Sequence, residues 1–421
     1  MIVNPCLMII LSALVVEYLM DVISTYLTLK SLDPVLPSEF DGIYEREKYQ
    51  QSQMYTRANI KFSQFSSALN FILILIIILW GGFNIVDSWV RGLSTHPVWG
   101  GLLFIGILFF IQDIILIPFS IYHSFVIEEK FGFNKMTIPL FILDKLKGYL
   151  LAIIFGSLIL GTILLIFETF GNFAWIIAWV ALTIFTIVLQ PVYIHYIAPL
   201  FNKFTPLESG ELISRLLAYA ARVKFPISGI FVMDVSKRST HSNAYFTGFG
   251  KSKRIVLYDT LLKSHPSSEL LTILAHEIGH YKKHHILMGM VISVIHTGVV
   301  LYLLSVFLNN SLLFEAFGMT HVSVYASILF FGVLYSPIEL ALSMGMNILS
   351  RRNEFEADHF SVETTSDPEN FIRGLKQLTI QNLSNLTPHP FTVFMSYSHP
   401  PVLNRIAAVR TIVLDPATPA I

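Results

Sequence analysis

An H-E-x-x-H pattern occupies residues 276–280, where two histidines flank a glutamate. Apolar residues recur at helical spacing just before and within the pattern, so a helix is expected here. On a helix, His276 and His280 lie one turn apart on the same face, where both imidazoles can bind one zinc ion. Glu277 lies one step round the helix and can act as the base for a water activated by the ion. The pattern therefore predicts zinc-assisted hydrolysis of a peptide bond.

A catalytic zinc site commonly has three protein ligands and leaves one position for water. His284 continues the i, i+4 series, but eight residues of helix rise about 12 Å, so His276 and His284 cannot share one ion. Glu354 and Asp358 share a helical face, whereas Glu356 points away from them. We expect Glu354 to be the third ligand and Asp358 to accept a hydrogen bond from a ligating histidine. The alternative is an ordinary charged helix start after a membrane span.

Gly279 lies inside the expected zinc helix. Glycine weakens a helix by about 1 kcal/mol relative to alanine. Its presence at this position predicts the close approach of another backbone.

The composition indicates a membrane protein. Hydrophobic residues make up 54% of the 421 positions and charged residues only 13%, which is too apolar for a soluble protein of this length. Lys+Arg and Asp+Glu are equal at 28 each, so there is no basic surplus for binding nucleic acid. Cys6 is the single cysteine, which excludes an intramolecular disulfide and a thiolate metal site.

Apolar stretches predict a multi-pass protein with seven membrane-spanning helices. Lys and Arg cluster after the first and third spans and are nearly absent from the opposite side, which predicts an N-terminus outside and a cytosolic C-terminus. Both halves of the expected zinc site then lie on the cytosolic side. The predicted spans are residues 5–28, 66–89, 98–122, 149–168, 173–196, 286–307 and 323–349.

Several ionisable residues fall inside the apolar spans, where charge is costly unless it faces water or the interior of a helix bundle. Glu17 and Asp21 are four residues apart, so one face of the first span is expected to be in contact with water. Asp113 lies in the middle of the third span, next to Gln112. We therefore expect the helices to enclose a polar cavity. For Asp87, which lies near a span end, the alternative is a side chain that reaches the interface.

Residues 200–285 form the longest stretch without a predicted span. Residues 211–223 are typical of an amphipathic helix, and residues 229–235, 243–249 and 254–259 of short strands. This predicts a small α+β unit ahead of the zinc helix. An extended peptide substrate can pair with a sheet edge, and Asn243, Ala244 and Tyr245 are the candidates for that edge. The alternative is an ordinary structural strand.

His399 precedes Pro400 and Pro401, and Arg405 follows six residues later. Proline holds the residue before it in an extended conformation, so His399 is expected in a turn and Arg405 in the helix after it. Zinc proteases need a donor for the developing oxyanion, and His399 could supply one. A purely structural role in the turn is the alternative.

These observations divide the chain into four consecutive parts. We expect a membrane domain with spans one to five, the first part of a catalytic domain with the H-E-x-x-H helix, membrane spans six and seven, and a second catalytic part with the third ligand, His399 and Arg405. Their boundaries are residues 1–199, 200–285, 286–350 and 351–421.

The chain resembles the type I CAAX prenyl endopeptidases, integral-membrane zinc metalloproteases of the gluzincin type, along nearly its whole length. Besides the H-E-x-x-H run and Glu354 to Asp358, the segments that carry the resemblance are Phe131-Gly132-Phe133-Asn134-Lys135, Ile197-Ala198-Pro199-Leu200-Phe201-Asn202-Lys203-Phe204, Ser242-Asn243-Ala244-Tyr245-Phe246 and Ser398-His399-Pro400-Pro401.

The resemblance implies seven transmembrane helices around a large water-filled intramembrane chamber, capped on the cytosolic side by a small α+β zinc domain. It implies one zinc ion per chain held by His276, His280 and Glu354, with Glu277 as base and with His399 and Arg405 near the substrate. Family substrates are prenylated proteins with a C-terminal C-a-a-X, which lose their last three residues. The partners implied are a protein or peptide substrate and the lipid bilayer.

Two departures from the family bear on the membrane. The segment between the last two spans is short, and the chain ends Pro416-Ala417-Thr418-Pro419-Ala420-Ile421 without a dilysine signal. Both features favour the cell (inner) membrane of a prokaryote, whereas a eukaryotic source implies the endoplasmic reticulum membrane.

Three functions compete. A prenyl-protein peptidase predicts cleavage that depends on the lipid, and a membrane quality-control metalloprotease predicts cleavage of unprenylated or misfolded proteins. A transporter or channel with a structural zinc predicts flux without proteolysis. The full set of base and ligands argues against the transporter, because a structural zinc usually has four protein ligands.

Overall fold

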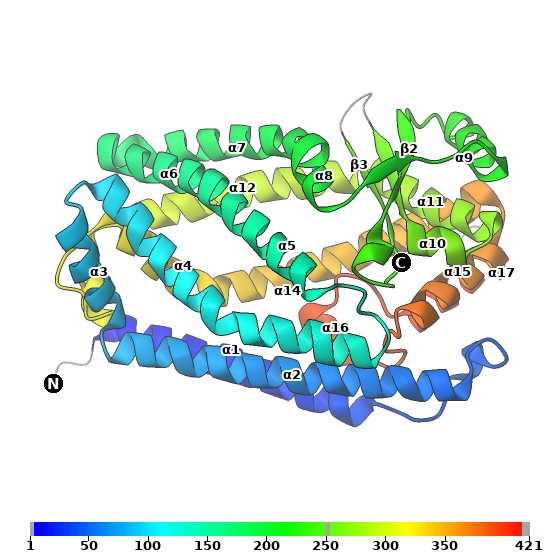
Figure 1. The fold of residues 1–421 in the computed structure, drawn as a ribbon, viewed down its shortest axis with the longest axis horizontal. Helices are drawn as coiled ribbons and strands as arrows, with labels where there is room; N and C mark the ends of the chain where they lie inside the picture. The colour runs from blue at the N-terminus through cyan, green and yellow to red at the C-terminus, as the bar shows by residue number, and fades with distance from the viewer. Residues whose placement is uncertain (1–3, 249–252, 415–421) are drawn as a thin grey trace.

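The computed structural model describes residues 4–248 and 253–414, and these are mostly helical (Figure 1). It contains seven helices that are long and apolar enough to cross a membrane, which agrees with the predicted number. They are α1 (Pro5–Ser31), α2 (Arg46–Leu79), Pro97–Glu128 (α4 Pro97–Tyr122 with η2 His123–Glu128), Ile138–Thr169 (α5 Ile138–Leu151, η3 Ala152–Gly156, α6 Ser157–Thr169), Gly171–Phe201 (η4 Gly171–Phe173, α7 Ala174–Val192, η5 Tyr193–Ile197, α8 Ala198–Phe201), α12 (His285–Phe307) and α14 (Val324–Thr365).

The second predicted span, residues 66–89, is wrong as a single helix. The helix α2 ends at Leu79, Gly81 adopts a left-handed conformation with φ 67°, and a separate amphipathic helix, α3 (Gly82–Leu93), follows. Glycine supplies this backbone turn at little cost because it has no Cβ. Hydropathy alone missed the break, since apolar residues continue on both sides of it.

The fourth and seventh spans are longer than predicted. The fourth helical segment begins at Ile138, not near residue 149. Helix α14 runs on from the seventh predicted span to Thr365, so the expected boundary between residues 350 and 351 falls inside one helix. At 1.5 Å per residue α14 is about 63 Å long, enough to cross a membrane and carry further residues beyond it.

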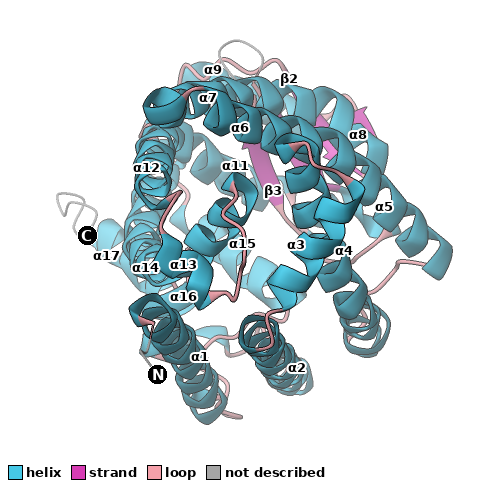
Figure 2. Ribbon diagram, turned by 90° about the vertical axis from the view of Figure 1, so that its left-hand side faces the viewer, coloured by secondary structure: helices cyan, strands magenta, loops and turns pink. Residues whose placement is uncertain are grey.

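Seen from the end that carries α3 and α13, the long helices are arranged as a ring (Figure 2). A cavity of about 900 Å³ lies between α1, α2, α3, α4, α14 and α16, and Glu17, Asp21 and Gln112 are among its lining residues. Polar side chains therefore line part of this cavity, as expected, but most of its lining residues are apolar. Asp113 is instead bound by Lys145 Nζ at 2.8 Å and Tyr149 Oη at 2.5 Å.

Asp87 lies on α3, beyond the end of the spanning helix α2. Its side chain is fully buried, and it pairs with Arg91 Nε at 2.7 Å and with the Tyr325 hydroxyl. Charged groups are rarely fully buried unless they are paired, and these two donors meet that requirement.

The predicted α+β unit lies at the end of the molecule opposite α3 and α13 (Figure 1). Its sheet has the order β1-β2-β4-β3, with a parallel pair at the centre from Gly229↔Arg254 to Met233↔Tyr258 and antiparallel pairs on both sides. The elements are β1 (Phe204–Pro206), α9 (Glu211–Arg222), β2 (Gly229–Met233), η6 (Val235–Lys237), β3 (Ala244–Thr247), β4 (Arg254–Tyr258), α10 (Asp259–Ser264) and α11 (Ser267–Lys282).

Three predicted strands are confirmed, and β1 is an additional one. Residue 249, at the end of the expected strand 243–249, lies outside the described residues, as do residues 416–421 of the chain end. One apolar core joins β2, β3 and β4 to α9 and α11, including Leu216, Ile230, Ile255, Leu257 and Leu274. Burial of these side chains fixes the zinc helix against the sheet.

The remaining helices complete the two ends of the molecule. Helix α15 packs against α11 and α17, while α16 contacts α1 and α14. Their bounds, with those of the two other short helices, are η1 (Ser38–Phe40), α13 (Ser311–Ala316), α15 (Pro368–Gln381), α16 (Pro390–Ser396) and α17 (Val402–Leu414).

Candidate metal centre

Two helices from distant parts of the chain bring three ligating side chains together. His276 and His280 lie on α11, and Glu354 lies on α14. The two Nε2 atoms are 3.2 Å apart, and the Glu354 carboxylate oxygens lie 3.5 Å from His276 Nε2 and 3.2 Å from His280 Nε2. The structure therefore brings together all three ligands predicted from the sequence.

Close packing of α11 on α14 makes this convergence possible. A Cβ at Gly279 would lie 3.1 Å from Ala357 Cα and 3.2 Å from Ala357 O. The expected close approach of another backbone is thus found, and that backbone belongs to the helix carrying Glu354. A side chain at position 279 would require the Ala357 backbone to shift, so the glycine permits this close packing of the two ligand-bearing helices.

The three side chains fit a zinc ion. Four ligands at about 2.1 Å in a tetrahedron are about 3.4 Å from one another, close to the separations found here. Glu354 is 4% exposed, and its buried Oε2 has no hydrogen-bond partner among the described residues. A buried carboxylate oxygen without a partner is costly. A cation between these atoms would remove that cost.

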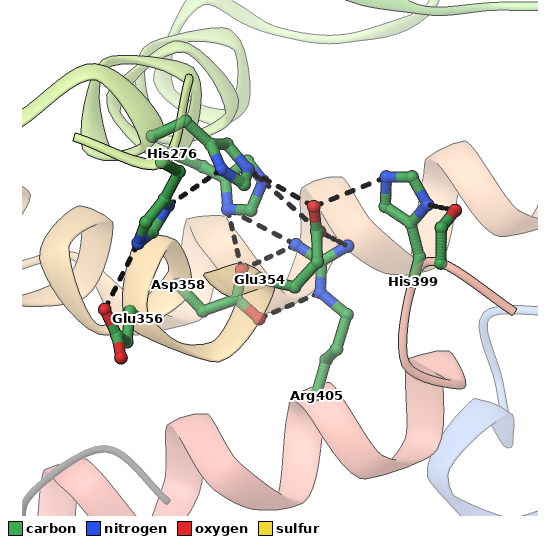
Figure 3. Close-up of polar contacts among 9 residues, drawn as sticks. His276, Glu354, Glu356, Asp358, His399 and Arg405 are labelled. Atoms are coloured by element: carbon green, nitrogen blue, oxygen red, sulfur yellow. Dashed lines mark hydrogen bonds and ion pairs between the residues drawn. The ribbon is translucent and has the colours of Figure 1, made fainter. Parts of the chain in front are cut away.

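Asp358 lies one turn beyond Glu354 and holds His276 from behind (Figure 3). His276 Nδ1 is 2.8 Å from Asp358 Oδ1, as a ligating histidine requires if its Nε2 is to face the ion. Burial lowers the pKa of His276, but the hydrogen bond and charge of Asp358 outweigh it and raise that pKa. The predicted Asp358 contact is therefore present.

Arg405 extends from α17 into the buried side of this cluster. Its guanidinium binds both oxygens of Asp358, and its Nη1 lies 3.5 Å from Glu354 Oε2. Only 13% of the side chain is exposed. The geometry places Arg405 behind the ligands, where it holds Asp358.

His399 occupies the opposite, open side of Glu354 (Figure 3). Its Nε2 lies 3.4 Å from Glu354 Oε1, and 67% of its side chain is exposed. It lies in the turn between α16 and α17, as the prolines after it predict. A group at this position can donate to a molecule that approaches the cluster from solvent.

Glu277 is half-buried beside the two ligating histidines. Burial raises the pKa of its carboxyl, and the charge of Glu354 adds to this, while His276 and His280 oppose it. A carboxyl with a raised pKa exchanges a proton with water more readily near neutral pH.

Asn243, Ala244 and Tyr245 lie at the start of β3 and just before it. In the part of the chain that the structure describes, β3 pairs with β4 only, so it is an edge of the sheet. β3 also packs against α11, the zinc helix. Tyr245 is half-buried, and Ala244 is 5% exposed.

Two residues at the centre were not identified as contacts from the sequence. His285 Nδ1 lies 3.1 Å from His280 Nδ1, and His285 Nε2 lies 3.2 Å from Glu356 Oε2. His284, which was excluded as a ligand because of the rise of the helix, is exposed and has φ 61°. The helix ends before His284, so helical spacing no longer applies there.

Comparison with known proteins agrees with this geometry. Residues 25–203 match the family described as CAAX prenyl protease N-terminal, five membrane helices, and residues 206–413 match peptidase family M48. CAAX prenyl protease 1 of Saccharomyces cerevisiae is 37% identical over 406 residues, covering 90% of this chain and 88% of that protein. The Homo sapiens CAAX prenyl protease 1 homolog is 30% identical over 422 residues, covering 89% of each.

A solved structure shares the whole fold. The crystal structure of S. mikatae Ste24p has a TM-score of 0.90 and 35% sequence identity, covering 96% of this chain and 99% of that one. The peptidase family spans the H-E-x-x-H helix and Glu354 alike. The chain therefore belongs to the M48 peptidases of the CAAX prenyl protease type, and it is a multi-pass membrane zinc metalloendopeptidase.

Proposed function

We propose that this chain removes the C-terminal tripeptide of prenylated proteins that end in C-a-a-X. The relatives named as CAAX prenyl proteases support this substrate class. The observation that carries the proposal is the cluster of His276, His280 and Glu354 on α11 and α14, where α14 is one of the membrane-spanning helices. A lipid-modified peptide needs an enzyme whose peptidase centre and apolar surface lie together.

We propose His276, His280 and Glu354 as the zinc ligands. When bound, the ion supplies a Lewis acid that polarises the peptide carbonyl and makes water more acidic. Asp358 holds His276 with its Nε2 facing the ligand cluster, and Arg405 holds Asp358. This role for Arg405 rests on its buried bidentate contact with Asp358.

Glu277 is the proposed general base and acid. Its carboxylate takes a proton from the attacking water as the water oxygen bonds to the peptide carbon, and it returns that proton to the amine when the C–N bond breaks. The imidazole of His399 donates a hydrogen bond to the carbonyl oxygen as negative charge develops there. The exposure of His399 beside Glu354 supports this role.

The peptide is proposed to bind as an added strand along β3. Asn243, Ala244 and Tyr245 would supply backbone groups at that edge, and the contact of β3 with α11 would hold the peptide bond near Glu277. The edge position of β3 and its packing on the zinc helix support this proposal.

The zinc centre is proposed to lie on the cytosolic side of the membrane, with the N-terminus outside and the C-terminus inside. The distribution of Lys and Arg supports this orientation. The similar proteins named above come from eukaryotes, which favours the endoplasmic reticulum membrane over a prokaryotic cell membrane. Residues 200–285 and 351–421 would form the catalytic unit, and residues 1–199 and 286–350 the membrane domain.

The test uses two peptides that end in the same C-a-a-X sequence, one farnesylated and one unmodified. Purified protein in detergent should release the tripeptide from the farnesylated peptide, and a zinc chelator should stop the reaction. Glu277→Gln should reduce turnover by about 10²–10⁴-fold while zinc remains bound. Glu363→Gln changes an exposed glutamate on α14 and serves as the control.

Each outcome separates the competing functions. Equal cleavage of both peptides would replace the prenyl-protein peptidase with a quality-control protease. Absence of cleavage of either peptide by zinc-loaded protein would contradict both. Substantial turnover by zinc-loaded Glu277→Gln would contradict the assignment of the base.

A further inference from the structure

His285 begins α12 at the point where the chain leaves the zinc helix. Helix α11 ends at Lys282, and His284 adopts φ 61°, a left-handed conformation that turns the chain back on itself. His285 is consequently returned to the zinc helix and is only 7% exposed. It meets His280 although the two residues do not share a helix.

The contacts of His285 form an unbroken chain of polar groups. His285 Nδ1 lies 3.1 Å from His280 Nδ1, and its Nε2 lies 3.2 Å from Glu356 Oε2. The other oxygen of Glu356 accepts from Arg352 Nε at 3.1 Å. Glu356 extends to the opposite side of the cluster from His399 (Figure 3), so this chain approaches the ligands from behind.

Counting protons gives one consistent arrangement for these two rings. A neutral imidazole has one N–H, and His280 must keep the lone pair on Nε2 because that atom faces the other ligands. The proton of His280 is therefore on Nδ1 and is donated to His285 Nδ1. His285 must then carry its own proton on Nε2, which it donates to Glu356.

The two ligating histidines are thus held by different means. His276 donates directly to the Asp358 carboxylate, which Arg405 secures. Among the described residues, the carboxylate on the Nδ1 side of His280 is that of Glu356, and it is linked to His280 through His285. A carboxylate behind a ligating histidine fixes its tautomer and ring orientation and makes it a stronger ligand.

We propose that His285 is a positioning residue. It accepts a hydrogen bond from His280 and donates one to Glu356, and these two bonds fix the ring of His280 in the orientation that binds zinc. The inference rests on the proposed function only in taking His280 as a zinc ligand. It also joins the metal centre to two membrane helices, because His285 is the first residue of α12 and Glu356 lies on α14. Zinc affinity should therefore depend on a residue that does not touch the ion.

The test measures the affinity of the full-length protein for Zn²⁺ alone, by competition with a chelator of known affinity. His285→Ala removes the acceptor from His280 and should weaken zinc binding about 10–100-fold. His285→Asn keeps a carbonyl oxygen near the position of Nδ1, so it should recover most of that loss. His284→Asn is the matched control, since Asn tolerates the left-handed conformation and His284 is exposed.

Two comparisons make the result decisive. Unchanged zinc affinity in His285→Ala, alongside loss of zinc in His280→Ala, would overturn this inference and leave the proposed function intact. Unchanged affinity in His280→Ala would overturn the ligand assignment itself. If His285→Ala does not fold, Glu356→Ala replaces it: weaker zinc binding is expected there as well, and unchanged affinity would refute the anchoring chain.

Discussion

Arg405 binds Asp358 through two parallel hydrogen bonds, from Nε to Oδ2 at 2.8 Å and from Nη2 to Oδ1 at 2.5 Å. Asp358 is 1% exposed, so its charge is removed from water. The guanidinium neutralises that charge while leaving Oδ1 in place to accept from His276. The orientation of one proposed zinc ligand therefore depends on a residue of the last helix, α17.

Arg405→Lys keeps the positive charge but loses the two-pronged geometry, because an ammonium group cannot bind both oxygens in parallel. We expect zinc affinity to fall about tenfold or more. Arg405→Ala leaves the buried Asp358 without its positively charged guanidinium partner and should lower the free energy of unfolding by about 3–5 kcal/mol. Chelator competition and thermal unfolding in detergent measure the two effects.

Arg410→Lys is the control for this prediction. Arg410 lies on the same helix, pairs with Glu39 at 2.7 Å and is 55% exposed. Exposed ion pairs contribute little, so this variant should match the parent protein in both measurements. If Arg405→Lys also matched the parent protein, Asp358 would not depend on the bidentate contact.

Glu354→Ala should abolish stoichiometric zinc binding, because two histidines remain as the only proposed ligands. Metal analysis after dialysis against zinc should give about one ion per chain for the parent protein and much less for the variant. Glu363→Ala, on the same helix but 66% exposed, should retain the ion. A Glu354→Ala protein that kept a full equivalent of zinc would show that another residue completes the site.

Gly279→Ala tests the contact between the two ligand-bearing helices. Alanine favours a helix by about 1 kcal/mol over glycine, but its Cβ would lie 3.1 Å from Ala357 Cα. Overpacking of this kind costs about 1–3 kcal/mol, so we expect lower stability together with weaker zinc binding. Thermal unfolding and chelator competition provide the measurements.

Gly289→Ala supplies the comparison, because a Cβ at that position on α12 would meet nothing within 4 Å. It should keep zinc affinity and stability at or above the parent values. A Gly279→Ala protein with unchanged zinc binding would mean that α11 and α14 can separate without moving the ligands.

Glu269 predicts a pH-dependent contribution to stability away from the metal. Burial raises the pKa of its carboxyl and exceeds the opposing effect of Arg373. A raised folded-state pKa means that this group stabilises the fold below its unfolded pKa of about 4.3 and that the contribution is lost as pH rises through the folded value. Glu269→Gln, which stays neutral, should therefore unfold at a higher temperature than the parent at pH 7.

The difference in unfolding temperature between Glu269→Gln and the parent protein should shrink as pH falls towards about 4. Glu208→Gln, at an exposed position, should show no comparable difference at either pH. A difference for Glu269→Gln that stayed constant with pH would mean that ionisation of Glu269 is not its cause.

Local spacing was enough to predict the ligand set. His276 and His280 share a helix, and helical periodicity determines which residues lie on the same face. Glu354 was recognised because a catalytic zinc needs a third ligand and because Glu354 shares a helical face with Asp358, which can support a ligating histidine. Gly279 predicted a close contact for the same kind of reason, since a glycine inside a helix has a cost that packing must offset.

Interruptions of regular structure were harder to predict. The break at Gly81 depends on a single residue in a left-handed conformation, and the apolar pattern continues on both sides of it, whereas at His284 the change from polar to apolar residues gave the start of the next span correctly. Each of these turns decides where the next helix points. The prediction of one span over residues 66–89 was wrong on this account, whereas the exclusion of His284 as a ligand agrees with its exposed position.

The sequence by itself determined the membrane class, the number of spans and the ligand types of the zinc centre, because hydropathy, helical spacing and ligand type are properties of short segments. Only the tertiary structure decided that Arg405 lies behind Asp358 and that His285 and Glu356 hold His280. These contacts join α11, α12, α14 and α17, and their geometry follows from the packing of whole helices against one another. No local pattern encodes a distance between residues so far apart in the chain.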